Sequence, residues 1–137
     1  MTLFLFLFGL AGLICWAVLL AAVAVGLAVL EPDVERVIVV GGDMPKLVPR
    51  VLRRLVDGLG PQARAVVLGV AGEAAPLPAA YDRQAASSAV ESLLSAGERR
   101  LRSLPERLKA HVVAATDWAD DDPTAATLRD IDRVEDL

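Results

Sequence analysis

The stretch that decides the fold reads Val37-Ile38-Val39-Val40-Gly41-Gly42-Asp43-Met44-Pro45. Its four consecutive β-branched residues favour a strand buried on both faces, as the strands of parallel sheets are. Two glycines end this strand and allow a ligand to approach the backbone closely, and a proline is typical of the first turn of a following helix. Asp43 is therefore predicted at the carboxyl edge of a sheet, where open α/β domains bind their ligands.

Apolar spacing along the rest of the chain predicts alternating strands and helices. The strands are expected at 34–40, 63–70 and 111–116, and the helices at 45–57, 83–96 and 98–109. Pro76 and Pro78 restrict the extended segment 76–81 to a sheet edge or a loop, because proline cannot donate a ladder hydrogen bond. The fold class predicted is α/β, a Rossmann-like three-layer parallel sheet preceded by a long hydrophobic helix.

The first 30 residues carry no charged side chain before Glu31. About 20 apolar residues in a helix can span a bilayer, so residues 3–30 are predicted as a transmembrane anchor. Lys and Arg occur only after this run, which would place the rest of the chain in the cytoplasm, held at the inner face of the cell membrane. Two other interpretations stay open: a buried core helix, and a signal peptide cut near Ala22-Val23-Ala24.

Composition excludes several classes of protein. The 137 residues hold 14 basic and 18 acidic side chains, a net charge of -4, so no nucleic-acid partner is expected. The single cysteine, Cys15, excludes a disulfide framework, and the single histidine, His111, excludes a histidine-rich metal site. The arginines of segment 45–57 and the acidic run 120–122 are each open to two interpretations, an ion site or a solvated surface.

Four segments in order resemble the MobA-like molybdenum cofactor guanylyltransferases, a nucleotidyltransferase family. The first is the strand and loop at 37–45, continued by Leu47-Val48-Pro49. The second and third are Pro76-Leu77-Pro78-Ala79-Ala80-Tyr81, which resembles the segment beneath the acceptor substrate, and the helix pair at 94–102. The fourth, residues 127–137, resembles the family's closing Asx-x-Asx-Thr-Pro-Glu-Asp-Leu pattern, although Arg133-Val134 replaces Thr-Pro.

The resemblance implies a division of the chain and a site. Residues 1–30 would be the hydrophobic helix, and residues 31–137 a partial MobA-like nucleotidyltransferase domain. Asp43 would hold Mg²⁺, and Asp130 (or Asp132) would take the second metal-facing position. The partners implied are a nucleotide, GTP, and a phosphorylated cofactor such as molybdopterin, and no side chain is assigned as nucleophile or general base. The residues expected to contact these ligands are Gly41, Gly42 and Pro78.

Departures from the family pattern define the alternatives. Residues 1–30 contain no counterpart of the glycine-rich loop that holds the triphosphate in this family. The chain is therefore expected to be a truncated or inactive guanylyltransferase-like protein, or else a small membrane-anchored accessory protein without catalysis. A partial sheet would also leave an unpaired edge, through which the chain could self-associate. Asp43 has a second interpretation, as a charge that stabilises the start of the next helix.

Overall fold

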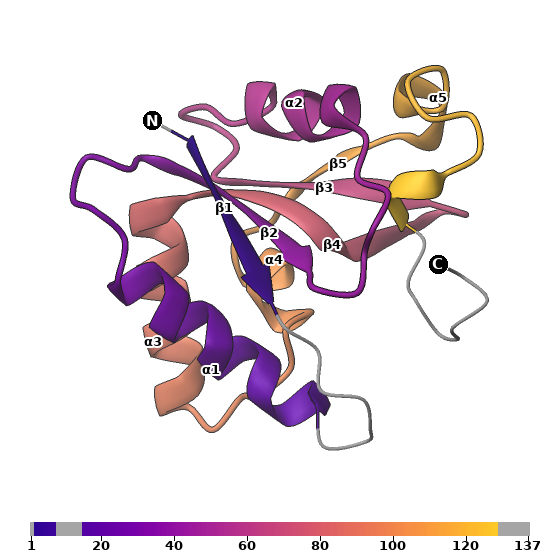
Figure 1. Cartoon of the computed structure of the whole chain (residues 1–137). Coiled ribbons are helices and arrows are strands. Elements are labelled where there is room, and N and C mark those ends of the chain that lie inside the picture. The colour runs from indigo at the N-terminus through magenta and orange to yellow at the C-terminus, as the bar shows by residue number, and fades with distance from the viewer. Residues whose placement is uncertain (1, 8–14, 129–137) are drawn as a thin grey trace.

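The computed structural model describes residues 2–7 and 15–128 (Figure 1). The strands are β1 (Thr2–Leu7), β2 (Arg36–Gly41), β3 (Ala65–Val70), β4 (Glu73–Asp82) and β5 (His111–Val113). The helices are α1 (Cys15–Ala28), α2 (Pro49–Asp57), α3 (Arg83–Ser95), α4 (Ser103–Arg107) and α5 (Ala115–Trp118), followed by the 3-10 turn η1 (Ala126–Leu128).

The five strands form one mixed sheet in the order β1-β2-β4-β3-β5. β1 runs parallel to β2, and β3 runs parallel to β5. β4 is antiparallel to both of its neighbours, β2 and β3, and lies between them. The α/β class is confirmed, but the prediction of a purely parallel sheet is wrong, because one central strand runs the other way.

The position of β4 corrects the prediction that its two prolines confine it to an edge. Pairing with β2 involves residues 79–82, and pairing with β3 involves residues 73–74 and 79–81. Pro76 and Pro78 fall in the interval between these pairs, where the register with β3 shifts between Val67 and Gly69. The missing N–H groups therefore remove no ladder bond, and the strand can occupy the centre of the sheet.

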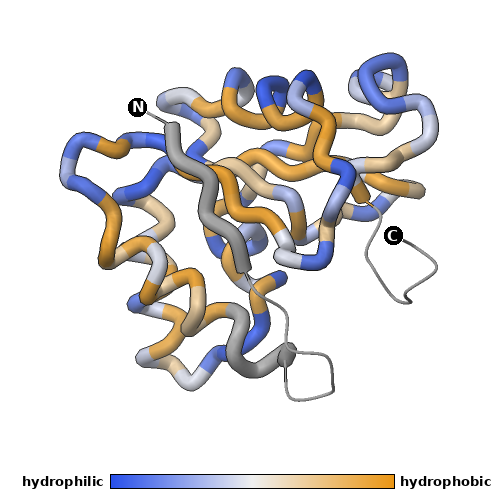
Figure 2. Tube along the Cα trace, in the orientation of Figure 1, coloured by the Kyte–Doolittle hydropathy of each residue, from blue (hydrophilic) through white to orange (hydrophobic). Residues whose placement is uncertain are grey.

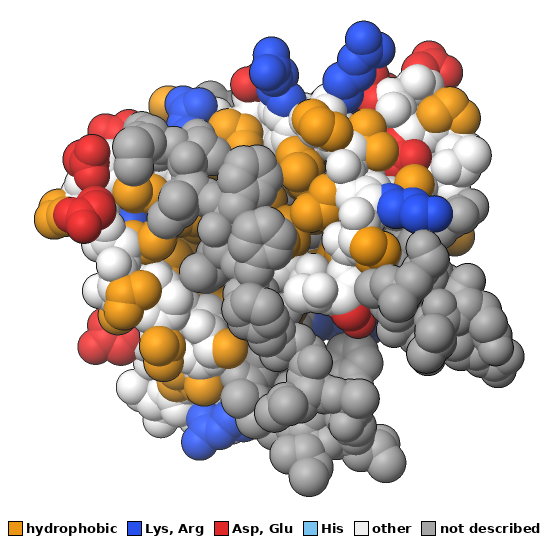
Figure 3. Space-filling view, viewed as in Figure 1, with side chains coloured by type: hydrophobic (Ala, Val, Ile, Leu, Met, Phe, Trp, Pro, Cys, Tyr) orange, Lys and Arg blue, Asp and Glu red, His pale blue; other side chains and the backbone are white. Residues whose placement is uncertain are grey.

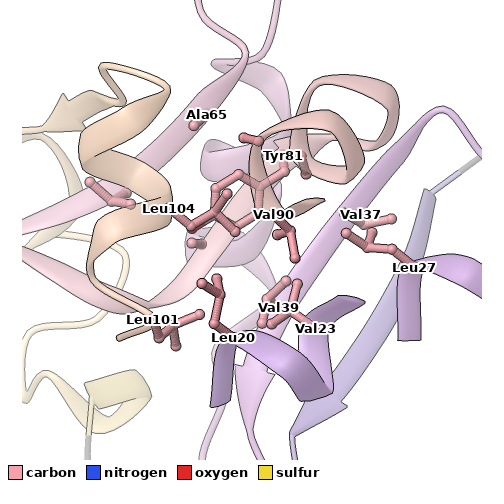
Figure 4. Close-up of a cluster of buried hydrophobic side chains, with 14 of the residues drawn as sticks. Leu20, Val23, Leu27, Val37, Val39, Ala65, Tyr81, Val90, Leu101 and Leu104 are labelled. Carbon is pink, nitrogen blue, oxygen red and sulfur yellow. The ribbon is translucent and has the colours of Figure 1, made fainter. Parts of the chain in front are cut away.

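Helices cover both faces of the sheet, which gives three layers (Figure 1). On one side α1, α3 and α4 pack over a core that includes Leu20, Val90 and Leu104, shown with Tyr81 in Figure 4. On the other side α2 and α5 cover a second core, which includes Leu55 and Trp118. The hydropathy trace places the apolar stretches along the strands and the inner sides of the helices (Figure 2).

The N-terminal run does not form the single hydrophobic helix expected over residues 1–30. Residues 2–7 form β1, an outer strand of the sheet, and α1 has only 14 residues. A long apolar run without clear periodicity does not distinguish a buried strand from a helix, which is why the sequence misled here. No helix in the described part of the chain is long and apolar enough to cross a membrane. Three residues of α1, Leu20, Val23 and Leu27, pack in the same core as Val37 and Val39.

The sheet described here has β1 and β5 at its two edges. β5 has three residues, and its Val112 is 43% exposed. Self-association through an edge stays a prediction.

Candidate functional site

A tight turn follows the carboxyl end of β2 and carries Asp43. The Met44 amide donates to the Gly41 carbonyl oxygen at 3.2 Å, and the Gly41 amide donates to the Met44 sulfur at 3.3 Å. Met44 is buried, whereas Gly42 and Asp43 are exposed. The carboxyl end of β1 lies beside this turn, since Leu7 is paired with Gly41. Asp43 thus stands at the carboxyl edge, as predicted from the sequence.

Glycine at position 41 allows a close approach of the Asp43 and Met44 side chains to the backbone, and its own backbone conformation is ordinary. A Cβ atom added there would lie 2.7 Å from the Asp43 Oδ1 atom and 3.1 Å from the Met44 Cγ atom. The Asp43 carboxylate therefore folds back over the Gly41 backbone, in space that no other residue type leaves free. Its side chain forms no hydrogen bond or ion pair with the rest of the described chain. The carboxylate is exposed and available to a ligand.

Of the other residues predicted to form the site, the structure describes Pro78 but not Asp130 or Asp132. Pro78 is buried in β4, one residue before Ala79, which is paired with Val39 of β2. It therefore lies beside β2, near the level of the Gly41 turn. Asp130 and the alternative Asp132 lie outside the described residues. Within residues 2–7 and 15–128, no group of three or more His, Cys, Asp or Glu side chains could hold a metal ion.

The segment between Asp43 and α2 is held in place by the end of the described chain. The Val48 amide donates to Thr127 Oγ1 at 3.1 Å, and Thr127 is fully buried. Buried Asp122 accepts hydrogen bonds from the amides of Ala126 at 2.9 Å and Thr127 at 2.8 Å. This contact was not predicted from the sequence. The Asp-Pro-Thr order at 122–124, typical of turns, was the available signal.

The ion-site interpretations of the acidic loop and of α2 gain no support. Asp121 pairs with Arg54 across the two segments, with 2.6 Å between Nη2 and Oδ2, and Asp122 binds backbone amides. Arg50, Arg53 and Arg54 are exposed on the outer face of α2, where basic side chains stand out along the top of Figure 3. Both groups therefore act as ordinary surface or turn-stabilising residues.

Two cavities lie away from the turn. One of 480 Å³ lies between α4 and strands β3 to β5, with Glu73, Arg102 and Lys109 among its lining residues. The other, of 450 Å³, lies where β2 and β3 begin. Neither is lined by Gly41, Gly42 or Asp43. The candidate site is thus an open edge in this part of the chain, with a carboxylate at a fixed turn.

A three-layer α/β domain with a carboxylate at the carboxyl edge of its sheet belongs to the class of folds whose ligands bind at that edge. Comparison with known families makes the assignment specific. Residues 17–115 match the MobA-like NTP transferase domain, and the chain belongs to that family. The match begins inside α1 and includes the Gly41 turn, β4 and α3, so it extends further toward the N-terminus than the resemblance seen at residues 31–137.

Solved structures share the fold. Molybdopterin-guanine dinucleotide biosynthesis protein A from Archaeoglobus fulgidus is 21% identical with a TM-score of 0.66, over 85% of this chain and 57% of that one. The 4-diphosphocytidyl-2C-methyl-D-erythritol synthase from Anaerococcus prevotii is 16% identical with a TM-score of 0.67, over 95% and 63%. A putative protein from Aquifex aeolicus is 15% identical with a TM-score of 0.63, over 83% and 56%.

These likenesses, below 25% identity, establish the fold alone. The chain spans less than two thirds of the length of each of the three structures. Among curated proteins, no sequence matches this one.

Proposed function

We propose that this domain is a Mg²⁺-dependent nucleotidyltransferase that transfers GMP from GTP to a phosphorylated cofactor of the molybdopterin type. The observation that carries the proposal is the Asp43 carboxylate, exposed on a glycine turn at the carboxyl edge, inside a region that matches the MobA-like family. The choice of guanine and of a molybdopterin acceptor rests on the sequence resemblance and on the Archaeoglobus neighbour, a molybdopterin-guanine dinucleotide biosynthesis protein.

The residues at this edge fit a magnesium site of the kind that substrate completes. Mg²⁺ is usually bound by one or two carboxylates together with water and phosphate oxygens. Asp43 supplies one such carboxylate, without a competing cation in the described chain. Asp130 is proposed as the second carboxylate. When bound, the metal would offset the negative charge that builds on phosphate oxygens during nucleotidyl transfer.

The chain's own contribution is positional. The turn from Gly41 to Met44 is fixed at both ends, by the β2 ladder and by the buried Met44 side chain. The Thr127 hydroxyl holds the next segment through the Val48 amide. A carboxylate on a rigid turn loses little conformational freedom when it binds, which favours affinity for a correctly placed ligand. Gly42, which is exposed, keeps the backbone beside the carboxylate open to the nucleotide.

A second candidate function is binding without catalysis. One sequence observation favours it: residues 1–30 contain no counterpart of the family's glycine-rich NTP loop. Such a protein would keep the α/β domain as a binding surface and show no nucleotide transfer.

Calorimetric titration of the whole chain with GTP tests nucleotide binding, and an assay of pyrophosphate release with a molybdopterin acceptor separates the transferase from the binding protein. The titrations use Mg²⁺ or a chelator, with CTP as the competing nucleotide. Asp43→Asn removes the charge and keeps the shape, while Asp57→Asn, at the far end of α2, is a control with the same change in charge. We expect Mg²⁺-dependent GTP binding that weakens about 10- to 100-fold in Asp43→Asn, the range for losing a contact to a charged group. The control should bind as the wild type does.

Three results would each count against one part of this proposal. Equal GTP affinity in Asp43→Asn and wild type would exclude Asp43 as the metal ligand. Tighter binding of CTP than of GTP would overturn the guanine assignment. Binding of GTP without pyrophosphate release in the presence of a molybdopterin acceptor would support the binding protein instead.

A further inference from the structure

The cavity of 450 Å³ lies at the opposite end of the sheet from Asp43. It is lined by the loop before β2, the loop between α2 and β3, and the junction of β4 with α3, which meet on the left of Figure 1. Arg36 opens β2 and Gly41 closes it, so the two ends are about 17 Å apart at roughly 3.3 Å per residue. A small ligand in this cavity would not reach the Asp43 turn.

A row of charged side chains crosses the sheet at the cavity. Asp82 of β4 is paired with Arg36 of β2 in the strand register. On its other side, Asp82 Oδ2 accepts a hydrogen bond from Arg64 Nη1 at 3.1 Å, and the Asp82 amide donates to the Arg64 carbonyl oxygen at 2.9 Å. Asp82 Oδ1 accepts from the Ala85 amide at 2.9 Å, which caps α3. The Asp82 carboxylate is thus already engaged by Arg64 and by the helix.

Two guanidinium groups at the cavity keep unused donors. The Arg36 side chain has no hydrogen bond or ion pair with the described chain, although it lies on the cavity wall. Arg83 Nη2 donates to the Pro32 carbonyl oxygen at 3.3 Å, which uses one of the five donors of a guanidinium. Three arginines and two carboxylates, Glu35 and Asp82, line the cavity, so its lining has one net positive charge.

We propose that this cavity binds a small phosphorylated molecule, with its phosphate oxygens on the free guanidinium donors of Arg36 and Arg83. The planar fork of arginine matches phosphate in geometry and charge. The cavity volume lies within the usual range for small-ligand sites, roughly 300–1,000 Å³. In a phosphate ester, the uncharged remainder of the ligand packs on the apolar part of the wall, which includes Leu59 and Pro61. The source of the phosphate is free phosphate or a phosphate ester.

The proposal is tested by following backbone amide signals in ¹H–¹⁵N NMR spectra of the whole chain. Inorganic phosphate and ribose 5-phosphate are titrated separately at millimolar concentrations, with ionic strength held constant by chloride so that screening does not change. We expect saturable shifts at the amides of residues 35–36, 59–64 and 82–84. Arg36→Gln and Arg83→Gln should each weaken binding at least tenfold. Arg53→Gln, on the outer face of α2, should not change it.

The two ligands distinguish the sources. Tighter binding of ribose 5-phosphate would identify a phosphate ester as the ligand, and equal affinities would identify free phosphate. Absence of saturable shifts with both ligands would overturn the proposal, and so would shifts that survive both arginine substitutions. The dispersion of the amide signals shows whether each variant is folded, and two independent variants guard against the loss of one. Asp43→Asn should leave these shifts unchanged, so this site and the proposed catalytic function fail separately.

Discussion

Tyr81 allows a direct test of how the core is packed, because its ring is buried in the core and its hydroxyl has no hydrogen-bond partner in the described chain. The residue is fully buried in β4, where it is paired with Val37 of β2 and Ala65 of β3 (Figure 4). Its Oη atom is buried without a hydrogen-bond partner in the described chain. An unsatisfied buried polar group destabilises a protein by about 1–3 kcal/mol. Tyr81→Phe removes that group and keeps the ring.

The expected gain in stability of Tyr81→Phe is the removed penalty minus the lost contacts of the oxygen. Removing the oxygen sacrifices a few van der Waals contacts, each about 0.1–0.2 kcal/mol, which leaves a net stabilisation of about 1–2 kcal/mol. An unfolding entropy of about 2.1 cal/mol/K per residue makes 1 kcal/mol equal to about 3.5 °C for 137 residues. Tyr81→Phe should therefore raise Tm by about 3–7 °C. Tyr81→Leu, which also loses the ring, should lower it.

The pH dependence gives an independent measurement. Burial raises the pKa of Tyr81 above its usual value of 10, because the charged phenolate is disfavoured in the core. Below pH 10 the folded and unfolded states both keep the phenol proton. Above pH 10 the unfolded state releases it first, so this part of the stability is lost as the pH rises. Urea unfolding of wild type should weaken above pH 10 more steeply than that of Tyr81→Phe.

A decrease of about 1 kcal/mol or more in the free energy of unfolding of Tyr81→Phe would contradict an unsatisfied Tyr81 hydroxyl. That result would mean that the hydroxyl has a partner, such as a buried water. Equal pH slopes for the two proteins would contradict burial of the phenol.

Local contacts also predict a change in GTP binding, a change in stability and a lowered pKa. Gly41→Ala should weaken Mg²⁺-dependent GTP binding at least about tenfold in calorimetry, because its Cβ displaces the carboxylate, whereas Gly60→Ala, with no atom within 4 Å of its Cβ, should not. Thr127→Val should reduce the urea-unfolding free energy by about 1 kcal/mol, since it removes the hydroxyl that accepts from the backbone amide ahead of α2. Hydrogen bonds from the Arg100 side chain and nearby amides lower the pKa of Glu98 to about 2, so an NMR titration should show this carboxylate still ionised at pH 4; a midpoint near 4.5 would contradict these contacts.

The sequence predicted the elements whose local signals agree with their surroundings. β2 follows from its β-branched run, and α3 follows from its apolar spacing. In the structure the Asp82 side chain caps α3, and Gly97, with a positive φ of 85°, lies just past the helix. Asp43 was predicted at the carboxyl edge because the two glycines that precede it mark the end of the strand.

The errors arose where non-local pairing overrides local signals. The two prolines in β4 predicted an edge strand. In the structure they lie where the register between β3 and β4 shifts, which no short sequence pattern reveals. The apolar run before residue 30 satisfied the length rule for a membrane helix, although part of it pairs with β2. The role of Thr127 depends on a contact with Val48, 79 residues away, which the turn signal at 122–124 does not reveal.

The antiparallel strand between β2 and β3 has a consequence for how the chain folds. β3 and β4 form a hairpin with a short connection, whereas β2 reaches β4 only after the chain from 36 to 82 has closed. Closing a loop some twentyfold longer costs about 2–3 kcal/mol more in chain entropy. The hairpin should therefore form early, and docking of β2 onto it should limit the rate of refolding.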